Sequence, residues 1–218
     1  MKGLLIKDLR YLRINKRFLI IFFFLSFIYM TIFDSLFFFT AFFSAGGMML
    51  SLTTFSYDDF DNGTVFLLSL PFTRKQFVIE KYLFAIGITT LIWAISMVVN
   101  TIYLIVTTGD LPSLSFMLPT IAIWFVYLLI TSLIIPIQFK FGPEKMGIAT
   151  MSIFAGFFVI GYFGNKLLQS VGTSLSKIID DILASSPLVS IVTLLMVCIV
   201  CFGISYLITI KIFTKKEF

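Results

Sequence analysis

The side chains that most often perform catalysis or bind metals are scarce in this sequence of 218 residues. It contains no histidine, no H-E-x-x-H or G-x-S-x-G motif, and no pair of glutamates on an apolar segment. Cys198 and Cys201 lie within an apolar run without the further ligands that a metal site or a disulfide framework needs, so we interpret them as buried free thiols. We therefore expect no catalytic, metal-binding or cofactor-binding residue in this chain.

Nucleotide hydrolysis through a phosphate-binding loop is not expected either. The G-x-x-x-x-G-K-[ST] pattern, whose backbone amides surround phosphate groups, does not occur. Any ATP-driven work must therefore be done by a partner chain. Proton-coupled transport would need several ionisable groups inside the membrane, whereas the apolar stretches carry neutral polar side chains such as Asn100 and Thr40.

The elements that position the remaining polar residues are hydrophobic helices. Of the 218 residues, 59% are hydrophobic and 12% are charged, 28 are phenylalanine, and the mean hydropathy is +1.07. A soluble domain of this length needs a more charged surface, whereas apolar stretches of about 20 residues match the thickness of a bilayer. The sequence predicts a single all-α integral membrane domain over residues 1–218, with no nucleotide-binding domain.

The number of spans follows from the lengths of the apolar stretches. Residues 18–55 contain no lysine or arginine and a single acid, Asp34. At about 1.5 Å per residue this stretch gives about 57 Å of helix, nearly twice the hydrocarbon thickness of about 30 Å. Two spans joined by a tight turn at Asp34 and Ser35 are therefore predicted. Six transmembrane helices are expected in total, at about residues 18–33, 36–55, 82–107, 116–137, 147–164 and 188–210.

The positions of the basic residues predict the orientation, because loops rich in Lys and Arg stay in the cytoplasm. With an inside N-terminus, 14 of the 16 basic residues lie on the cytoplasmic side, and only Lys166 and Lys177 lie outside. Both termini and the loop 57–81 are therefore expected in the cytoplasm. The outer loop 108–115 is too short for a receptor or catalytic domain.

Two segments outside the spans have the spacing of amphipathic helices. The N-terminal segment carries Leu5, Leu9 and Leu12 among basic residues, which predicts a helix lying in the inner membrane interface. The alternative is that it serves only as a positive topology anchor. Between the fifth and sixth spans, Leu168, Val171 and later apolar residues predict an outer helix that rests on or dips into the outer leaflet.

The loop 57–81 contains two consecutive helix signals. Residues 61–64 have turn and capping chemistry before the apolar run VFLLSL, and Pro71 ends that first short helix. Thr73 and Gln76 then form a capping box, while Phe72 and Phe77 have the spacing of a hydrophobic staple.

A stiff helical hairpin that leads directly into the third span is therefore predicted on the cytoplasmic side. Its second helix is expected to begin at Arg74 and to enter the span without a break. Such a hairpin is suited to docking another protein, and a push on its Pro71 corner would move the third span. The alternative, a role in topology alone, would need the basic residues but not the cap, the staple and the proline together.

Small residues mark possible close contacts between helices, because they let backbones approach. They predict either a subunit interface and translocation path or ordinary internal packing. These residues are Ser44, Gly46 and Gly47 in the second span and Ser152, Gly156 and Gly161 in the fifth.

A family resemblance rests on the layout and on two segments. The six spans, the loop DNGTVFLLSLPFTRKQFVIEKY and the segment IIPIQFKFGPEK resemble the membrane subunit of ABC type-2 exporters. The chain is similar in particular to small permeases of Gram-positive bacteria that export amphipathic or antimicrobial peptides, including the phenol-soluble-modulin exporter permeases.

The resemblance implies an assembly and a mechanism. Two permease subunits, identical or paralogous, would pair in the bacterial plasma membrane above two ATP-binding-cassette ATPase subunits that hold ATP and Mg²⁺. The loop after the second span would be the coupling helix, the second and fifth spans would approach the central path, and the segment 166–181 would lie above the exit. ATPase docking would fall on Asp61, Asn62, Val65, Phe66, Leu68, Leu70, Pro71, Phe72 and Thr73, with Arg74 and Lys75 at its edge. Gly142, Glu144 and Lys145 would form a second inner contact, for which the alternative is a simple Gly-Pro turn.

Two other functions stay open. A substrate-binding membrane module of an energy-coupling uptake transporter also has about six spans in about 200 residues. It would be expected to show polar ligand-contacting groups in its outer half and no capped inner hairpin. A membrane enzyme is the third possibility, and it lacks the intramembrane titratable groups that catalysis requires. The sequence does not identify the cargo.

Overall fold

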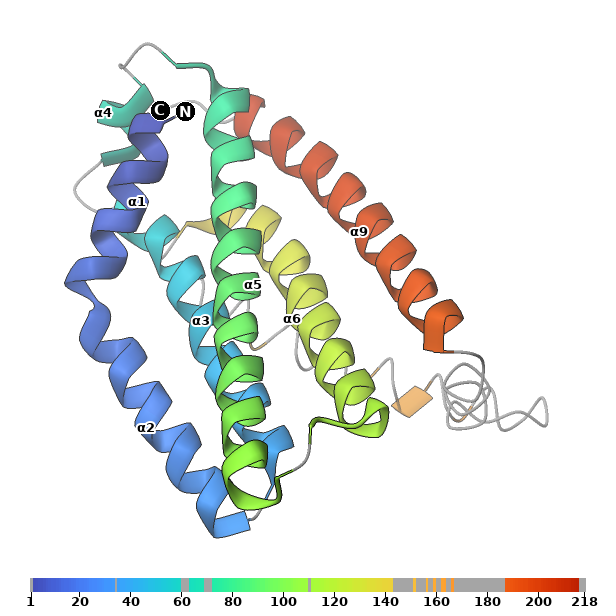
Figure 1. Cartoon of the computed structure of the whole chain (residues 1–218). Coiled ribbons are helices and arrows are strands. Elements are labelled where there is room, and N and C mark those ends of the chain that lie inside the picture. Colours follow the sequence, from blue (N-terminus) through green and yellow to red (C-terminus); the bar gives the residue numbers. More distant parts are fainter. Residues whose placement is uncertain are drawn as a thin grey trace.

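All the secondary structure in the described part of the chain is helical (Figure 1). The computed structural model describes residues 2–33, 35–59, 63–68, 72–109, 111–142 and 187–215, with isolated positions 151, 156, 159, 162, 163 and 166. Its helices are α1 (Lys2–Ile14), α2 (Lys16–Phe33), α3 (Leu36–Asp59), α4 (Gly63–Leu68), α5 (Arg74–Thr107), α6 (Leu114–Phe141) and α9 (Pro187–Lys215).

Five of these helices are long and apolar enough to cross a membrane, namely α2, α3, α5, α6 and α9. The prediction of an all-α integral membrane protein is therefore confirmed. Residues 34 and 35 alone separate α2 from α3, at the place where a tight turn was expected. The predicted fifth span and the predicted outer amphipathic helix lie largely outside the described residues. Of that region, the six isolated described positions are helical.

The helices differ in length, and this difference creates an overhang. The 18 residues of α2 span about 27 Å, close to the hydrocarbon thickness, whereas the 34 residues of α5 span about 51 Å. About 20 Å of α5 therefore extends beyond the hydrocarbon. The overhang lies at the end of the bundle where α1 begins and α9 ends (Figure 1), which we call the terminal end.

The central helix of the bundle is α3, which packs against α2, α5 and α6, while α9 packs mainly on α6. Gly46 and Gly47 permit this arrangement. A Cβ atom at Gly46 would lie 2.5 Å from the Phe22 ring of α2, and one at Gly47 would lie 2.7 Å from Ile92 of α5. Both glycines thus allow close contacts within the chain.

Buried hydrogen bonds fix the register of neighbouring helices. Asn100 of α5 donates to the Thr40 hydroxyl of α3 at 2.7 Å, and the Tyr127 hydroxyl of α6 donates to the Ala41 carbonyl at 2.7 Å. Because hydrocarbon supplies no competing donors or acceptors, such bonds favour one helix arrangement over sliding alternatives.

The face that α1 turns toward the bundle differs from the expected one. Leu4 and Asp8 are buried, Leu5 and Leu12 pack against the core, and Leu9 is 53% exposed. The three leucines therefore do not form one membrane-facing stripe. Figure 1 shows the cause, since α1 leads into α2 through a bend and packs against α3 and α5. Packing on the protein takes up Leu5 and Leu12.

We expect Gly47→Ala to lower the unfolding free energy by about 1 to 3 kcal/mol, because the added methyl group overpacks the contact with Ile92. Gly87→Ala is the matched control, since Gly87 is also inside a helix but no described atom lies within 4 Å of its Cβ position. That change should be neutral or slightly stabilising, because alanine favours helix. Thermal loss of the size-exclusion peak in detergent measures both, and equal effects would contradict the packing argument.

Candidate functional site

A short helix stands beside the start of α5 at the terminal end (Figure 1). This helix, α4, follows α3 closely, and a Cβ atom at Gly63 would lie 2.7 Å from the Asp58 carbonyl oxygen. Leu67 packs on the core beneath, whereas the Phe66 side chain is 68% exposed. The contacts of Gly63 and Leu67 thus fix the position of α4, and the helix exposes the large apolar side chain of Phe66.

The predicted helix start at Thr73 is confirmed in detail. The Thr73 hydroxyl accepts from the Gln76 backbone N–H at 3.2 Å, and the Gln76 side-chain oxygen accepts from the Thr73 N–H at 3.0 Å. The Phe72 and Phe77 rings stack with centroids 6.3 Å apart. Cap and staple together fix the angle at which the chain enters α5. We call residues 63–68 and 72–76 the hairpin segment.

Arg74 connects the hairpin segment to the last described helix. Its guanidinium donates to the backbone carbonyls of Phe213 and Thr214 at 3.0 and 3.1 Å, at the C-terminal end of α9. A cation at the C-terminal end of a helix is favoured by the helix dipole. The neighbouring Lys75 is exposed.

Four phenylalanines behind the hairpin segment join four helices. Phe55 of α3, Phe77 of α5, Phe139 of α6 and Phe213 of α9 are all buried, and we call them the aromatic cluster. Phe77 lies 6.0 Å from the Phe139 ring and 5.6 Å from the Phe213 ring, and the Phe139 and Phe213 rings are 5.0 Å apart. A displacement of Phe77 would therefore act on α6 and α9 through direct ring contacts.

Beside the aromatic cluster, four buried or partly buried charges connect α1, α3 and α5. The Lys81 ammonium lies 2.6 Å from Asp8 and 2.5 Å from Asp58, and Lys7 pairs with both carboxylates. We call these four residues the charged cluster. The Lys81 side chain is fully buried, and those of Asp8 and Asp58 are 2% and 8% exposed.

The surroundings of Lys81 make its two carboxylate partners essential. Its ammonium lies 5.2 Å from the Phe55 ring and 5.6 Å from the Phe77 ring, so aromatic faces occupy much of the remaining space. Burying charges costs free energy that only their partners offset, and removal of one member leaves the others uncompensated. Glu80, next along α5, is also fully buried, and neither of its carboxyl oxygens has a hydrogen-bond partner among the described residues.

The charged cluster was not predicted from the sequence, where Lys7 and Lys81 were counted only among the 14 basic residues expected on the cytoplasmic side. A signal was nevertheless present. On a helix beginning at Arg74, Lys81 shares a face with Phe77 and Ala85, both apolar. A lysine on an apolar helix face predicts a buried acidic side chain that pairs with it. The sequence alone does not identify that acid.

The other residues with predicted roles are distributed as follows. Gly142 caps the C-terminal end of α6 with a positive φ of 70°, and its N–H donates to the Gln138 carbonyl at 2.9 Å. Ser44 is buried, no described atom lies within 4 Å of a Cβ on Gly156, and the backbones of Val65 and Leu68 are helical. Outside the described residues are Asp61, Asn62, Leu70, Pro71, Glu144, Lys145, Ser152 and Gly161.

An apolar groove of about 700 Å³ lies along α6, on the side facing Phe37 of α3. Pro119, Val126 and Tyr127 are among the α6 residues that line it. Of the small residues predicted for a path, the described ones, Ser44, Gly46, Gly47 and Gly156, do not line it. Among the described residues, no group of three His, Cys, Asp or Glu side chains is placed to hold a metal ion.

Lys81→Met should lower the unfolding free energy by about 3 to 5 kcal/mol, because Asp8 and Asp58 would lose their buried counter-charge. Lys75→Met is the matched control on the same helix, because Lys75 is exposed and should cost less than about 0.5 kcal/mol. Thermal unfolding in detergent compares the two proteins. A Lys81 variant as stable as the control would show that the charged cluster does not hold α1, α3 and α5 together.

Comparison with known proteins places the chain in a family. The family model described as ABC-2 family transporter protein matches residues 3–214, nearly the whole chain. No curated protein and no solved structure is significantly similar. The family implies a membrane location and partnership with an ATP-binding-cassette ATPase. The chain therefore belongs to the ABC-2 transporter family and is a transmembrane permease subunit of an ATP-binding-cassette transporter.

Proposed function

We propose that this permease exports an amphipathic peptide and that a separate ATPase, which binds ATP and Mg²⁺, drives its alternating access. The observation that carries the proposal is the hairpin segment, in which an exposed Phe66 stands beside a capped and stapled helix start. An aromatic side chain held on a rigid seat is a typical anchor for a partner's pocket. The hairpin segment, with the adjoining residues of the predicted docking set, forms the docking site.

The structure of α5 supports a role as the lever. It runs for 34 residues without a break from Arg74, so its capped end and its far end belong to one rigid rod of about 51 Å. The Tyr82 hydroxyl bonds to the Ser205 and Thr209 hydroxyls of α9 at 2.5 and 2.8 Å. A push on the hairpin segment would therefore move α5 together with α9.

Two further connections extend this movement to other helices. The aromatic cluster joins the start of α5 to α3, α6 and α9, while the charged cluster joins it to α1 and α3. The α5 members of the two clusters, Phe77 and Lys81, lie within the first eight residues of that helix, next to the proposed docking site. A movement of the hairpin segment, driven by closure of the ATPase, would therefore be passed to five helices through the aromatic cluster and the charged cluster.

The cytoplasmic placement of the terminal end belongs to the same proposal. Basic side chains on the described helices concentrate there, including the exposed Arg10, Arg13 and Lys75, as expected for the inner side of a bacterial plasma membrane. ATP is available on that side, so a docking site for an ATPase must also lie there. Outward export is the direction that the resemblance to peptide-exporting permeases favours.

The apolar groove along α6 supports an amphipathic cargo. Its lining is almost entirely hydrophobic, so it suits the apolar face of a helical peptide better than a small polar solute. A second permease copy, identical or paralogous, would complete the path around such a cargo. Of the small residues predicted near the path, Gly156 has no described atom within 4 Å of its Cβ position and is a candidate for that interface.

Phe66→Glu should weaken ATPase association by about thirtyfold, because a charge would replace an anchor worth about 2 kcal/mol. ATP-dependent uptake of a fluorescent amphipathic helical peptide into inside-out membrane vesicles should fall in parallel. Association is measured as the amount of ATP-binding-cassette ATPase that copurifies with the tagged permease from native membranes.

Phe66→Leu is the control, since it keeps an apolar side chain and should retain most of both activities. A peptide of the same composition but scrambled, non-amphipathic order should not be transported. Unchanged ATPase association in the Glu variant would overturn the docking site. Copurification with a scaffold subunit shared among uptake systems would instead support the uptake module.

The orientation is tested with single cysteines in a chain whose Cys198 and Cys201 are replaced by alanine. Thr73→Cys at the terminal end should react with a membrane-impermeant maleimide only after the cells are opened. Leu111→Cys, at a position that is 75% exposed near the opposite end, should react in intact cells. Labelling of both positions from the same side would exclude the proposed topology.

A further inference from the structure

A cavity of about 210 Å³ lies between α1 and α3 at the terminal end. Its lining includes Lys7, Arg10, Tyr11 and Ile14 of α1 and Tyr57 of α3. The Tyr11 and Tyr57 rings contact each other across the two helices with centroids 4.6 Å apart. We call this cavity the α1–α3 pocket. Neither the docking site nor the lever described above uses it.

The depth of the pocket in the membrane follows from the helix that comes next. Because the 18 residues of α2 match the hydrocarbon thickness, its first residue, Lys16, marks where hydrocarbon ends. The last two turns of α1, which line the pocket, directly precede that position. The pocket therefore opens at the level of the phospholipid headgroups.

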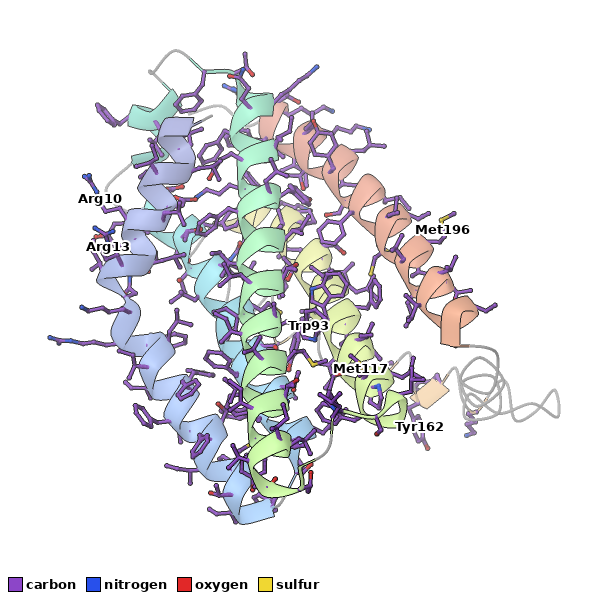
Figure 2. The ribbon with its side chains drawn as sticks, viewed as in Figure 1. Arg10, Arg13, Trp93, Met117, Tyr162 and Met196 are labelled. Atoms are coloured by element: carbon purple, nitrogen blue, oxygen red, sulfur yellow. The ribbon has the colours of Figure 1, made fainter. Side chains whose placement is uncertain are left out.

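The outer face of α1 has the character of a surface that contacts headgroups. Ile6, Leu9 and Ile14 are 59%, 53% and 67% exposed, and they alternate with the exposed Arg10 and Arg13. Figure 2 shows both arginines extending from α1 away from the bundle. Exposed apolar side chains interleaved with arginines are typical of a helix that faces the interface of an anionic membrane.

At the edge of the pocket, one cation is available for a ligand. The charges that face it are those of Lys7, Asp8, Arg10 and Asp58, and both carboxylates are already paired with Lys7 and Lys81. Among the described residues, Arg10 has no ion pair and no side-chain hydrogen bond. The negative charges of Asp8 and Asp58 are thus balanced by Lys7 and Lys81. The positive charge of the Arg10 guanidinium has no such partner among the described residues.

We propose that the α1–α3 pocket binds an anionic phospholipid, with Arg10 at the edge of the pocket as the ligand of the headgroup phosphate. The guanidinium fork matches two phosphate oxygens, which an ammonium group does not. The tyrosine pair forms the wall of the site, and Ile14 lies on the side where the acyl chains begin. A lipid in this position bridges α1 and α3 from outside, opposite the buried Lys81 bridge.

The test compares two arginines of the same helix. Purified full-length permease in a neutral detergent is titrated with phosphatidylglycerol, and bound lipid is counted by native mass spectrometry. Arg10→Gln should weaken retention of the first phosphatidylglycerol about tenfold, because a charge-assisted phosphate contact is lost. Arg13→Gln is the matched control, since Arg13 is exposed one turn away but does not line the pocket, and it should change retention less than twofold.

Further measurements distinguish a lipid from a soluble phosphate ligand. They also distinguish binding at one site from general electrostatic attraction. Phosphatidylcholine should be retained less well than phosphatidylglycerol, and inorganic phosphate should not raise the thermal stability. Tyr57→Ala should also weaken retention, without touching any charge. Equal losses for the Arg10 and Arg13 variants would show diffuse electrostatic attraction, and stabilisation by inorganic phosphate would identify a soluble ligand. Either result, or no preference for phosphatidylglycerol, would overturn the proposal.

Discussion

The structure of the terminal end depends on the ion pairs of one buried ammonium group with two carboxylates. Lys81 is fully buried between Asp8 of α1 and Asp58 of α3, with aromatic rings on its other sides. None of the three charges can leave the cluster without exposing the others to an apolar surrounding. The start of α5, the end of α3 and the N-terminal helix are therefore held in one relative position, and the hairpin segment is built on that fixed base.

This base explains why a helix of six residues can present an exposed aromatic side chain in a defined place. The six residues of α4 are too few to be stable alone, and its order comes from Gly63 packed on α3 and Leu67 packed on the core. On the other side, the Thr73 cap and the Phe72 staple set the direction of α5. Local capping and buried charge together give the rigidity that mechanical coupling to a partner requires.

Features that depend on neighbouring residues could be predicted from the sequence. Features that depend on contacts between residues far apart in the chain could not. The helix start at Thr73 follows from residues within four positions, so the sequence predicted it correctly. The pairing of Lys81 with Asp8 joins residues 73 positions apart, which no local pattern can specify. The stripe on α1 was assigned wrongly for a related reason, because Leu5 and Leu12 pack on helices whose position depends on the whole bundle.

The contact of Arg74 with the end of α9 has a consequence for the order of synthesis. The carbonyl oxygens that it binds belong to residues 139 and 140 positions further along the chain. During translation, the hairpin segment therefore emerges long before the helix end that completes its support. A chain whose last described helix has not yet inserted lacks these two hydrogen bonds, so the start of α5 reaches its final support only when α9 is in place.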